Sequence, residues 1–399
     1  MADTNTSVKV RSARWSLSAT VLSAGFSLTG AGTVMLGVLL PILSQRWGLR
    51  DDRAGFLLFI QFFASGLGAI VTGLNRIRSL VLGYGLLAVA LTGLSLNGPK
   101  IVYEAFFVYG LGLGMAMTST SLLFSDRWES DRAAKLEWLN FVWSVGATAG
   151  PICFLPFLRE GNLRLLFMMM LVLSLALLAW VGLMERVAPK FAPKPKSTHV
   201  PQPVRPVFAM LLLLAMTAVG AEASLSGWLT TYSQRAGMRS LVGAAFATSI
   251  FWLGEMLSRL GFSTRLMAKA GQRSVLHWGI WGVTVSAVAV IVAPRPWLIL
   301  VAAGAAGASL GPIYPLSLSY LLELSPWGWI FAVGGMGAAL FPWITGSVSA
   351  HFHSLRYGLV VPCLAGLVMM GLNAVIFGFA QPDRTEAGIK NNVFKQPHI

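Results

Sequence analysis

The sequence predicts an all-α membrane protein of twelve transmembrane helices, arranged as two pseudo-symmetric six-helix bundles. Three observations support this fold class: the composition, a series of twelve apolar stretches, and an internal repeat. Of the 399 residues, 55% are hydrophobic and only 11% are charged. A soluble domain of this length has roughly a quarter of its residues charged, because they cover its surface. This chain therefore faces a less polar solvent than water.

Twelve apolar stretches, bounded by Gly, Pro or charged residues, are long enough to cross a bilayer, which takes about 20 residues. They cover 16–44, 54–75, 79–97, 101–125, 133–158, 162–184, 206–233, 241–263, 274–293, 297–322, 328–350 and 356–379. The first residues are polar and no small-residue cleavage site follows them. We therefore expect the first stretch to be a retained helix and not a signal peptide.

A segment rich in Pro and Lys, 185–205, separates the sixth stretch from the seventh. Because Pro interrupts helices, we interpret it as a cytoplasmic linker between an N-terminal bundle (1–184) and a C-terminal bundle (206–380). Residues 381–399 are then a cytoplasmic tail. Placing the linker and both termini in the cytoplasm puts twenty of the 30 Lys and Arg residues inside, as the positive-inside rule requires.

An internal repeat relates the two predicted bundles. SQRWGLR at 44–50 follows the first stretch and SQRAGMR at 233–239 follows the seventh, with five of seven positions identical at an offset of 189 residues. At a nearly equal offset, a Gly and a Pro of the fifth stretch recur in the eleventh: Gly146 and Pro151, then Gly337 and Pro342. Parallel six-helix repeats of this kind are typical of secondary transporters.

Short motifs distributed over nearly the whole chain are GVLLP at 37–41, WGL at 47–49, LNFVWSVGA at 139–147, and VGAE at 219–222 followed by Trp228 and Tyr232. Together they resemble the fucose permease and sodium-dependent glucose carrier branch of the major facilitator superfamily. The resemblance implies a sugar carrier. That branch has acidic residues inside its first and fourth spans, whereas here the first has none and the fourth has only Glu104, near its outer end. The resemblance therefore does not extend to proton coupling or to the identity of the sugar.

Glu222 lies near the middle of the seventh stretch, where a charged side chain costs about 2.5 kcal/mol or more. We expect it to line a central cavity, where it binds substrate hydroxyls or a coupling cation. The alternative is an interhelical hydrogen bond that orders the bundle, although a neutral Gln would serve that purpose equally well.

Glu255 and Arg259 are spaced four residues apart in the eighth stretch, so they can pair on one helix face. The pair is either a gate beside the cavity or a structural pair at the inner end of the helix. Glu137, about one turn into the fifth stretch, is expected to anchor the cytoplasmic gate.

Sugars are bound by planar polar groups that form paired hydrogen bonds and by aromatic rings that cover their C–H faces. The candidates with this chemistry are Gln61, Asn140, Trp143, Trp252 and Tyr314. The alternatives are an interhelical hydrogen bond for the amides and simple packing for the rings. Tyr314 lies between two prolines, in a weakened helix of the kind found at transporter sites.

Other classes of site are not indicated. His351 and His353 have no third ligand nearby, so we expect no metal site. Cys153 and Cys363 lie in apolar stretches and suggest no disulfide framework. The net charge of +15 is scattered over short loops, which fits membrane orientation and not nucleic-acid binding. No catalytic group of residues shares one face, so we do not expect an enzyme.

The sequence thus predicts a monomeric secondary active transporter of the cell inner membrane, with both termini cytoplasmic. Its expected partners are the lipid bilayer and a hexose or related sugar that it moves by alternating access. We expect no cofactor apart from a coupling H⁺ or Na⁺, and coupling itself is left open. The alternative is a proton-coupled exporter of drugs or amphipathic, lipid-like compounds, since a cavity rich in Met and Phe with one acid also suits those.

Overall fold

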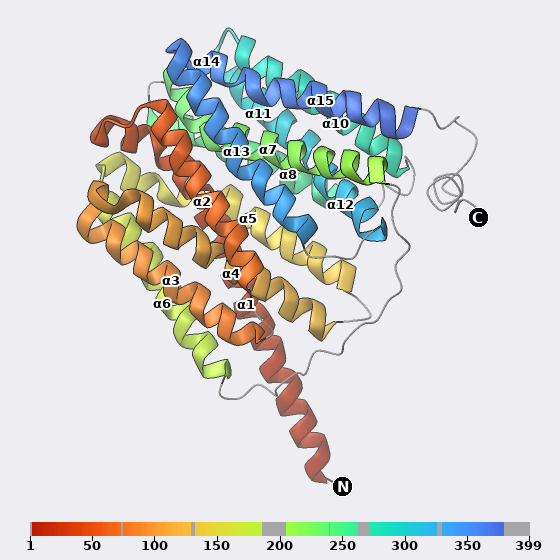
Figure 1. The fold of residues 1–399 in the computed structure, drawn as a ribbon. Coiled ribbons are helices and arrows are strands. Elements are labelled where there is room, and N and C mark those ends of the chain that lie inside the picture. Colours follow the sequence, from red (N-terminus) through yellow and green to blue (C-terminus); the bar gives the residue numbers. More distant parts are fainter. Residues whose placement is uncertain are drawn as a thin grey trace, which may run out of the picture.

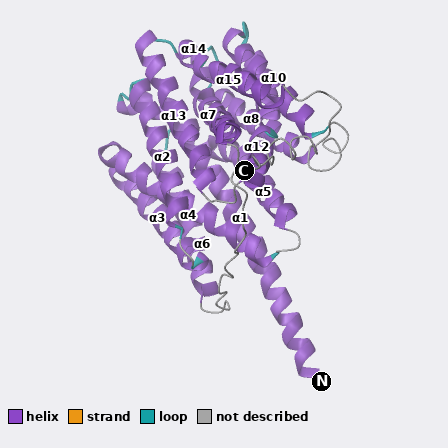
Figure 2. Ribbon diagram, turned by 45° about the vertical axis from the view of Figure 1, so that its right-hand side comes forward, coloured by secondary structure: helices purple, strands orange, loops and turns teal. Residues whose placement is uncertain are grey.

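The structure is a computed structural model that describes residues 2–72, 75–128, 132–185, 205–238, 240–261, 271–324 and 329–378. All regular secondary structure in these ranges is helical (Figures 1 and 2). Nearly all of the predicted linker, and the whole predicted tail, lie outside the described residues.

The first half of the chain forms six helices in the places where the sequence predicts them. They are α1 (Ala2–Trp47), α2 (Asp51–Val71), α3 (Arg76–Asn97), α4 (Val102–Arg127), α5 (Arg132–Glu160) and α6 (Leu163–Glu185), with a short 3-10 turn at Gly98–Ile101 before α4. Helix α1 begins well before the predicted start at residue 16.

The second half contains α7 (Arg205–Arg235), α8 (Leu241–Gly261), α10 (Gln272–Val292), α11 (Pro296–Leu310), α12 (Ile313–Leu324), α13 (Trp329–Phe352), α14 (Leu355–Gly358) and α15 (Val360–Gly378). The tenth predicted span is therefore two helices, α11 and α12, and not one. The break falls at Gly311 and Pro312, because Pro312 and Pro315 lack the N–H groups that would continue the helical hydrogen bonds.

Ten stretches of the described chain are long and apolar enough to cross a membrane, and one of them, Arg76–Arg127, contains both α3 and α4. The chain is thus a multi-pass membrane protein. Many large apolar side chains on its outer surface are exposed, which is the expected state of residues that face lipid tails.

Several of the main helix contacts are the same in the two halves. In the first half α1 packs on α5, α2 on α4, and α3 on both α4 and α6; in the second, α7 packs on α13, α8 on α11, and α10 on both α11 and α15. Equivalent glycines make equivalent contacts: a Cβ on Gly146 would overlap the carbonyl oxygen of Ser27, and a Cβ on Gly337 that of Met216. The internal repeat of the sequence is therefore also a repeat of packing.

The halves lie side by side, the first coloured red to yellow-green and the second green to blue in Figure 1. They meet mainly along three helix pairs: α1 with α7, α2 with α13, and α5 with α8. The α1–α7 contact is very close, since a Cβ on Gly37 would lie 2.9 Å from the Cα of Gly227. Small residues at such crossings let membrane helices pack backbone to backbone.

Candidate functional site

A cavity of about 250 Å³ lies between the two halves. The residues that line it come from α1, α2, α4 and α5 of the first half and from α7, α8 and α13 of the second. Most of the lining is apolar, and the polar and aromatic residues in it are Thr33, Gln61, Phe62, Ser65, Thr118, Trp143, Glu222, Ser226 and Trp252. Ligand sites in membrane transporters are typically found at such an interface between repeats.

Gln61 of α2 is fully buried in the wall of the cavity. Its Nε2 donates a hydrogen bond to the carbonyl oxygen of Thr33 in α1, at 3.0 Å. This bond orients the amide, and Oε1 has no hydrogen-bond partner among the described residues. A buried carbonyl without a partner is costly, so Gln61 presents an acceptor that a bound molecule can satisfy.

Trp143 of α5 and Trp252 of α8 meet across the boundary between the halves. Their ring centroids are 5.1 Å apart and their planes are inclined at 77°, the edge-to-face geometry that aromatic pairs prefer. Both rings line the cavity. Both indole Nε1–H groups are buried without a hydrogen-bond partner in the part of the chain that the structure describes, so each ring supplies an apolar surface and an unused donor.

Glu222 of α7 is half-buried and lines the same cavity. Within the described ranges its carboxylate forms no hydrogen bond or ion pair. The interhelical hydrogen bond that was the alternative for this residue is therefore not present there. Glu222 therefore lines the cavity as an acid whose acceptor oxygens are available to a bound molecule.

Glu255 and Arg259 of α8 form the ion pair that their spacing predicts. Glu255 is completely buried. Arg259 also crosses to the first half, where its Nη1 donates a hydrogen bond to Ser144 Oγ of α5 at 3.1 Å. Arg259 interacts electrostatically with Glu222 as well. The pair therefore links the two halves next to the cavity, although neither residue lines it.

Two of the residues predicted to bind substrate, Asn140 and Tyr314, do not line the cavity. Asn140 lies on the same face of α5 as Trp143 and Ser144, one turn nearer the start of the helix, and there it is exposed and does not line the cavity. Tyr314, on α12, packs against α13, where a Cβ on Gly334 would lie 3.3 Å from its ring, and it does not line the cavity. The side chain of Glu137 lies outside the described part of the structure.

The sequence analysis did not single out the small polar lining residues Thr33, Ser65, Thr118 and Ser226. Ser and Thr side chains in helices often bond to a carbonyl of their own helix, as Thr33 Oγ1 does to Thr29 at 2.8 Å. Their presence in an apolar stretch is therefore a weak signal for a site.

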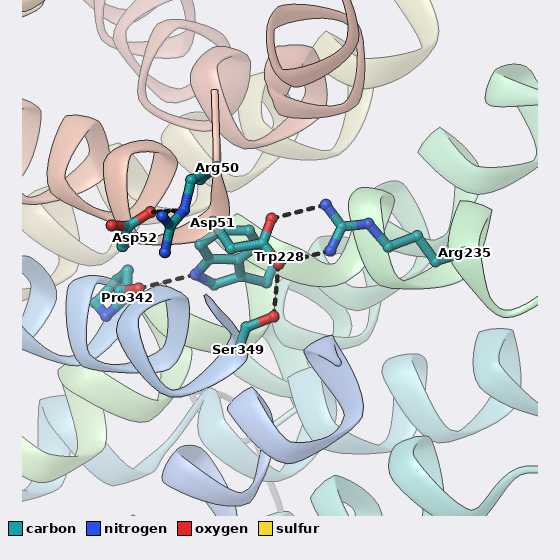
Figure 3. A network of polar contacts seen from close by, with 7 residues as sticks. All are labelled: Arg50, Asp51, Asp52, Trp228, Arg235, Pro342 and Ser349. Atoms are coloured by element: carbon teal, nitrogen blue, oxygen red, sulfur yellow. Dashed lines mark hydrogen bonds and ion pairs between the residues drawn. The ribbon is translucent and has the colours of Figure 1, made fainter. Parts of the chain in front are cut away.

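A second feature that the sequence analysis missed is a polar network at the predicted outer end of the halves (Figure 3). Arg235, the last residue of α7, donates hydrogen bonds to both carboxylate oxygens of Asp51, the first residue of α2, at 2.6 and 2.7 Å. Ser349 of α13 donates to Asp51 at 2.5 Å. Nearby, Trp228 Nε1 donates to the carbonyl oxygen of Pro342 at 2.9 Å. The network joins α2 of the first half to α7 and α13 of the second.

Comparisons with known proteins agree with this architecture. A family model described as Major Facilitator Superfamily matches residues 22–326. Among solved structures, the chain is similar to one titled as a bacterial homolog to the human lysosomal transporter Spinster, in an inward-facing and unoccupied conformation. That match has a TM-score of 0.65 at 17% identity and covers 90% of this chain and 96% of the other. No curated relative matches the chain in sequence.

Proposed function

The chain belongs to the Major Facilitator Superfamily, a family of membrane transporters and not of enzymes, and we propose that it carries a small polyhydroxylated solute, such as a hexose. The solute binds in the cavity between the halves, and rocking of the halves exposes it to each side of the membrane in turn. We place the protein in the cell inner membrane, with both termini in the cytoplasm.

The observation that carries this proposal is the mixture of unused hydrogen-bonding groups around the cavity. Trp143 and Trp252 each offer a donor without a partner, and Gln61 Oε1 offers an acceptor without one. Each hydroxyl group of a sugar is both a donor and an acceptor. A polyhydroxylated molecule can therefore satisfy all three groups and still donate to the carboxylate of Glu222.

The size of the cavity also favours a small solute. Sites for drug-sized ligands usually measure roughly 300–1,000 Å³, and this cavity measures about 250 Å³. The faces of Trp143 and Trp252 suit the C–H surface of a sugar ring.

The alternative, export of an amphipathic or lipid-like cation, is supported by the apolar lining and by Glu222. Such a compound would pair with the carboxylate and fill the space beside Phe62 and Met117. It has few acceptors for the two indole N–H groups, so they would stay unsatisfied at a cost of about 1–3 kcal/mol each. For this reason it ranks second.

Coupling to an ion would depend on the acids near Arg259. Glu222 and Glu255 are two carboxyl groups that interact with one guanidinium. If both acids are ionised, one negative charge is left uncompensated, and a proton or Na⁺ bound there would neutralise it. We infer that Glu222 is the coupling residue, because Glu255 already has Arg259 as its ion-pair partner.

Trp143→Phe and Trp252→Phe test the proposal, because each change keeps an aromatic face and removes only the N–H donor. Uptake into proteoliposomes should be measured with radiolabelled hexoses and polyols, and binding with a panel of amphipathic cations. Loss of one hydrogen bond to the substrate should weaken apparent sugar affinity about tenfold per variant and leave cation binding unchanged. Absence of saturable sugar or polyol uptake by the wild-type protein, together with saturable binding of the cations, would reject the proposal in favour of the alternative.

A further inference from the structure

A second cavity, of about 530 Å³, lies on the side of the second half, between α10 and α15. Its polar and aromatic lining residues are Arg273, Ser274, His277, Trp278, Trp281, Asn373 and Phe377. Neither α10 nor α15 contributes to the cavity between the halves. We propose that this second cavity binds a phospholipid headgroup that combines a phosphate with a hydrogen-bond donor, either a hydroxyl or an ammonium group.

The positive charge for the phosphate comes from Arg273, in the first turn of α10. Its guanidinium donates a hydrogen bond to the carbonyl oxygen of Phe377 near the end of α15, and it lies 6.0 Å from the centre of the Phe377 ring. These contacts hold the charge across the groove between the two helices. The N-terminal end of the 21-residue α10 has no side-chain cap, and its N–H groups add to the attraction for an anion.

The requirement for a donor in the headgroup comes from Asn373 of α15. This residue is only 7% exposed. Its Nδ2 lies 3.1 Å from His277 Nδ1, whereas its Oδ1 has no hydrogen-bond partner among the described residues. A buried amide oxygen without a partner costs about 1–3 kcal/mol. A hydroxyl or an ammonium on the ligand would supply the missing donor, whereas a quaternary ammonium has no N–H with which to do so.

The apolar surroundings suit the rest of a phospholipid. Trp278 is 71% and Trp281 44% exposed at the edge of the cavity, and Trp residues collect at the level of lipid headgroups. Beyond them the two helices stay in contact, since a Cβ on Gly366 of α15 would overlap the Thr284 hydroxyl of α10. Exposed apolar side chains continue along both helices at Val285, Val288, Val292, Leu364, Leu367 and Val368. Acyl chains can lie along this surface.

The location also fits the lipid. The first turn of α10 and the last turn of α15 lie on the side that the positive-inside rule assigns to the cytoplasm. Basic pockets between transmembrane helices on that side are typical binding sites for lipid headgroups. A soluble phosphate ester could meet Arg273 as well, but it would make no use of the apolar groove.

Native mass spectrometry of the purified full chain tests this inference and does not depend on whether the protein transports a sugar. The probes are phosphatidylglycerol, phosphatidylethanolamine, phosphatidylcholine and free glycerol 3-phosphate. The wild-type protein should retain one molecule of the first two lipids about tenfold more tightly than phosphatidylcholine. Arg273→Gln should weaken retention of all three lipids about tenfold, and Asn373→Leu should abolish the preference over phosphatidylcholine.

Arg356→Gln is the matched control, because Arg356 is an exposed arginine of the same half that does not line the cavity. This variant should retain each lipid as tightly as the wild type does. If the change at the buried Asn373 prevents folding, Trp278→Ser alters an exposed position and should still weaken retention severalfold. Equal retention by wild type, Arg273→Gln and Trp278→Ser overturns the site. If the wild type retains phosphatidylcholine as tightly as phosphatidylglycerol and phosphatidylethanolamine, the role of Asn373 is overturned. Tight binding of glycerol 3-phosphate that displaces the lipids overturns the lipid as the occupant.

Discussion

Arg235 and Asp51 form a bidentate hydrogen-bonded ion pair, with N–O distances of 2.6 and 2.7 Å, that joins the two halves of the protein at one end. Asp51 is largely shielded, with 11% of its side chain exposed, while Arg235 is 43% exposed. The additional bond from Ser349 means that three helices from both halves converge on one carboxylate. The geometry predicts that this pair helps to hold the halves closed at this end, which the positive-inside rule assigns to the outer side of the membrane.

Asp51→Asn should favour opening of the outer side. Charge-assisted hydrogen bonds are worth about 1.5–3 kcal/mol, and partial exposure reduces this value, so we expect the population of outward-open molecules to rise about tenfold. Distances between spin labels at Arg164 and Arg356, on opposite halves, would report the change.

Arg50→Gln provides a matched control for this experiment. Arg50 also pairs with an aspartate, Asp52, at 3.4 Å, but both residues belong to the first half (Figure 3). This variant should leave the distance distribution unchanged. If Asp51→Asn behaves like Arg50→Gln, the pair between the halves does not hold the outer side closed.

Gly346 of α13 is packed against the first half so closely that a Cβ would overlap the carbonyl oxygen of Asp51 and lie 2.8 Å from Trp228. Gly346→Ala should therefore force the outer ends of α2 and α13 apart. We expect a larger outward-open population and slower net transport, while the thermal stability of each half changes little.

Gly371→Ala is the control for Gly346→Ala, because a Cβ at that helical position meets nothing within 4 Å. It should leave transport unchanged and stabilise α15 slightly, since Ala is the better helix former. Equal effects of the two substitutions on the outward-open population would argue against a steric role for Gly346.

The Glu255–Arg259 pair should respond asymmetrically to removal of its two partners. Arg259→Met leaves the fully buried Glu255 without a counter-charge, and breaking a buried pair in this way costs about 3–5 kcal/mol. Glu255→Gln should cost less, because Arg259 is 18% exposed and can extend its charged end towards water. Thermal unfolding in detergent measures both variants. A larger loss for Glu255→Gln than for Arg259→Met would contradict this account of the pair.

The sequence identifies the polar residues that lie inside apolar stretches, but it does not show which of them line the cavity. Gln61 and Glu222 could be picked out because polar groups at membrane depth are costly, and both line the cavity. Asn140 attracted attention for the same reason but is exposed. Asn140 and Trp143 share one face of α5, and only Trp143 lines the cavity, so the helical spacing does not define how far along the helix the cavity extends.

Asp51 was missed for a related physical reason. It is the first residue of α2. A charged residue at the end of a membrane helix costs little free energy, so the sequence gives no reason to single it out. Its partner Arg235 belongs to the repeated Ser-Gln-Arg motif, whose equivalent in the first half, Arg46, lies instead against Gly161. The repeat revealed that the two loops are related, but which arginine crosses between the halves depends on tertiary packing.

Glu222→Gln is expected to separate binding from ion coupling. The substitution keeps an acceptor oxygen for a substrate hydroxyl but removes the negative charge. The described part of the structure shows no hydrogen bond or ion pair that the change would break, and a neutral amide costs less than a carboxylate at membrane depth, so we expect no decrease in the free energy of unfolding. Counterflow exchange of the substrate should persist, while accumulation driven by a proton or Na⁺ gradient should be lost.

Exchange and gradient-driven uptake should be measured on the same proteoliposomes, since the comparison between them carries the information. Loss of both activities in a folded Glu222→Gln protein would show that substrate binding requires the carboxylate. Unchanged accumulation would remove Glu222 from the mechanism and leave Glu255 as the acid to test. Retention of exchange alone would assign ion coupling to Glu222, because only the charge of the side chain was taken away.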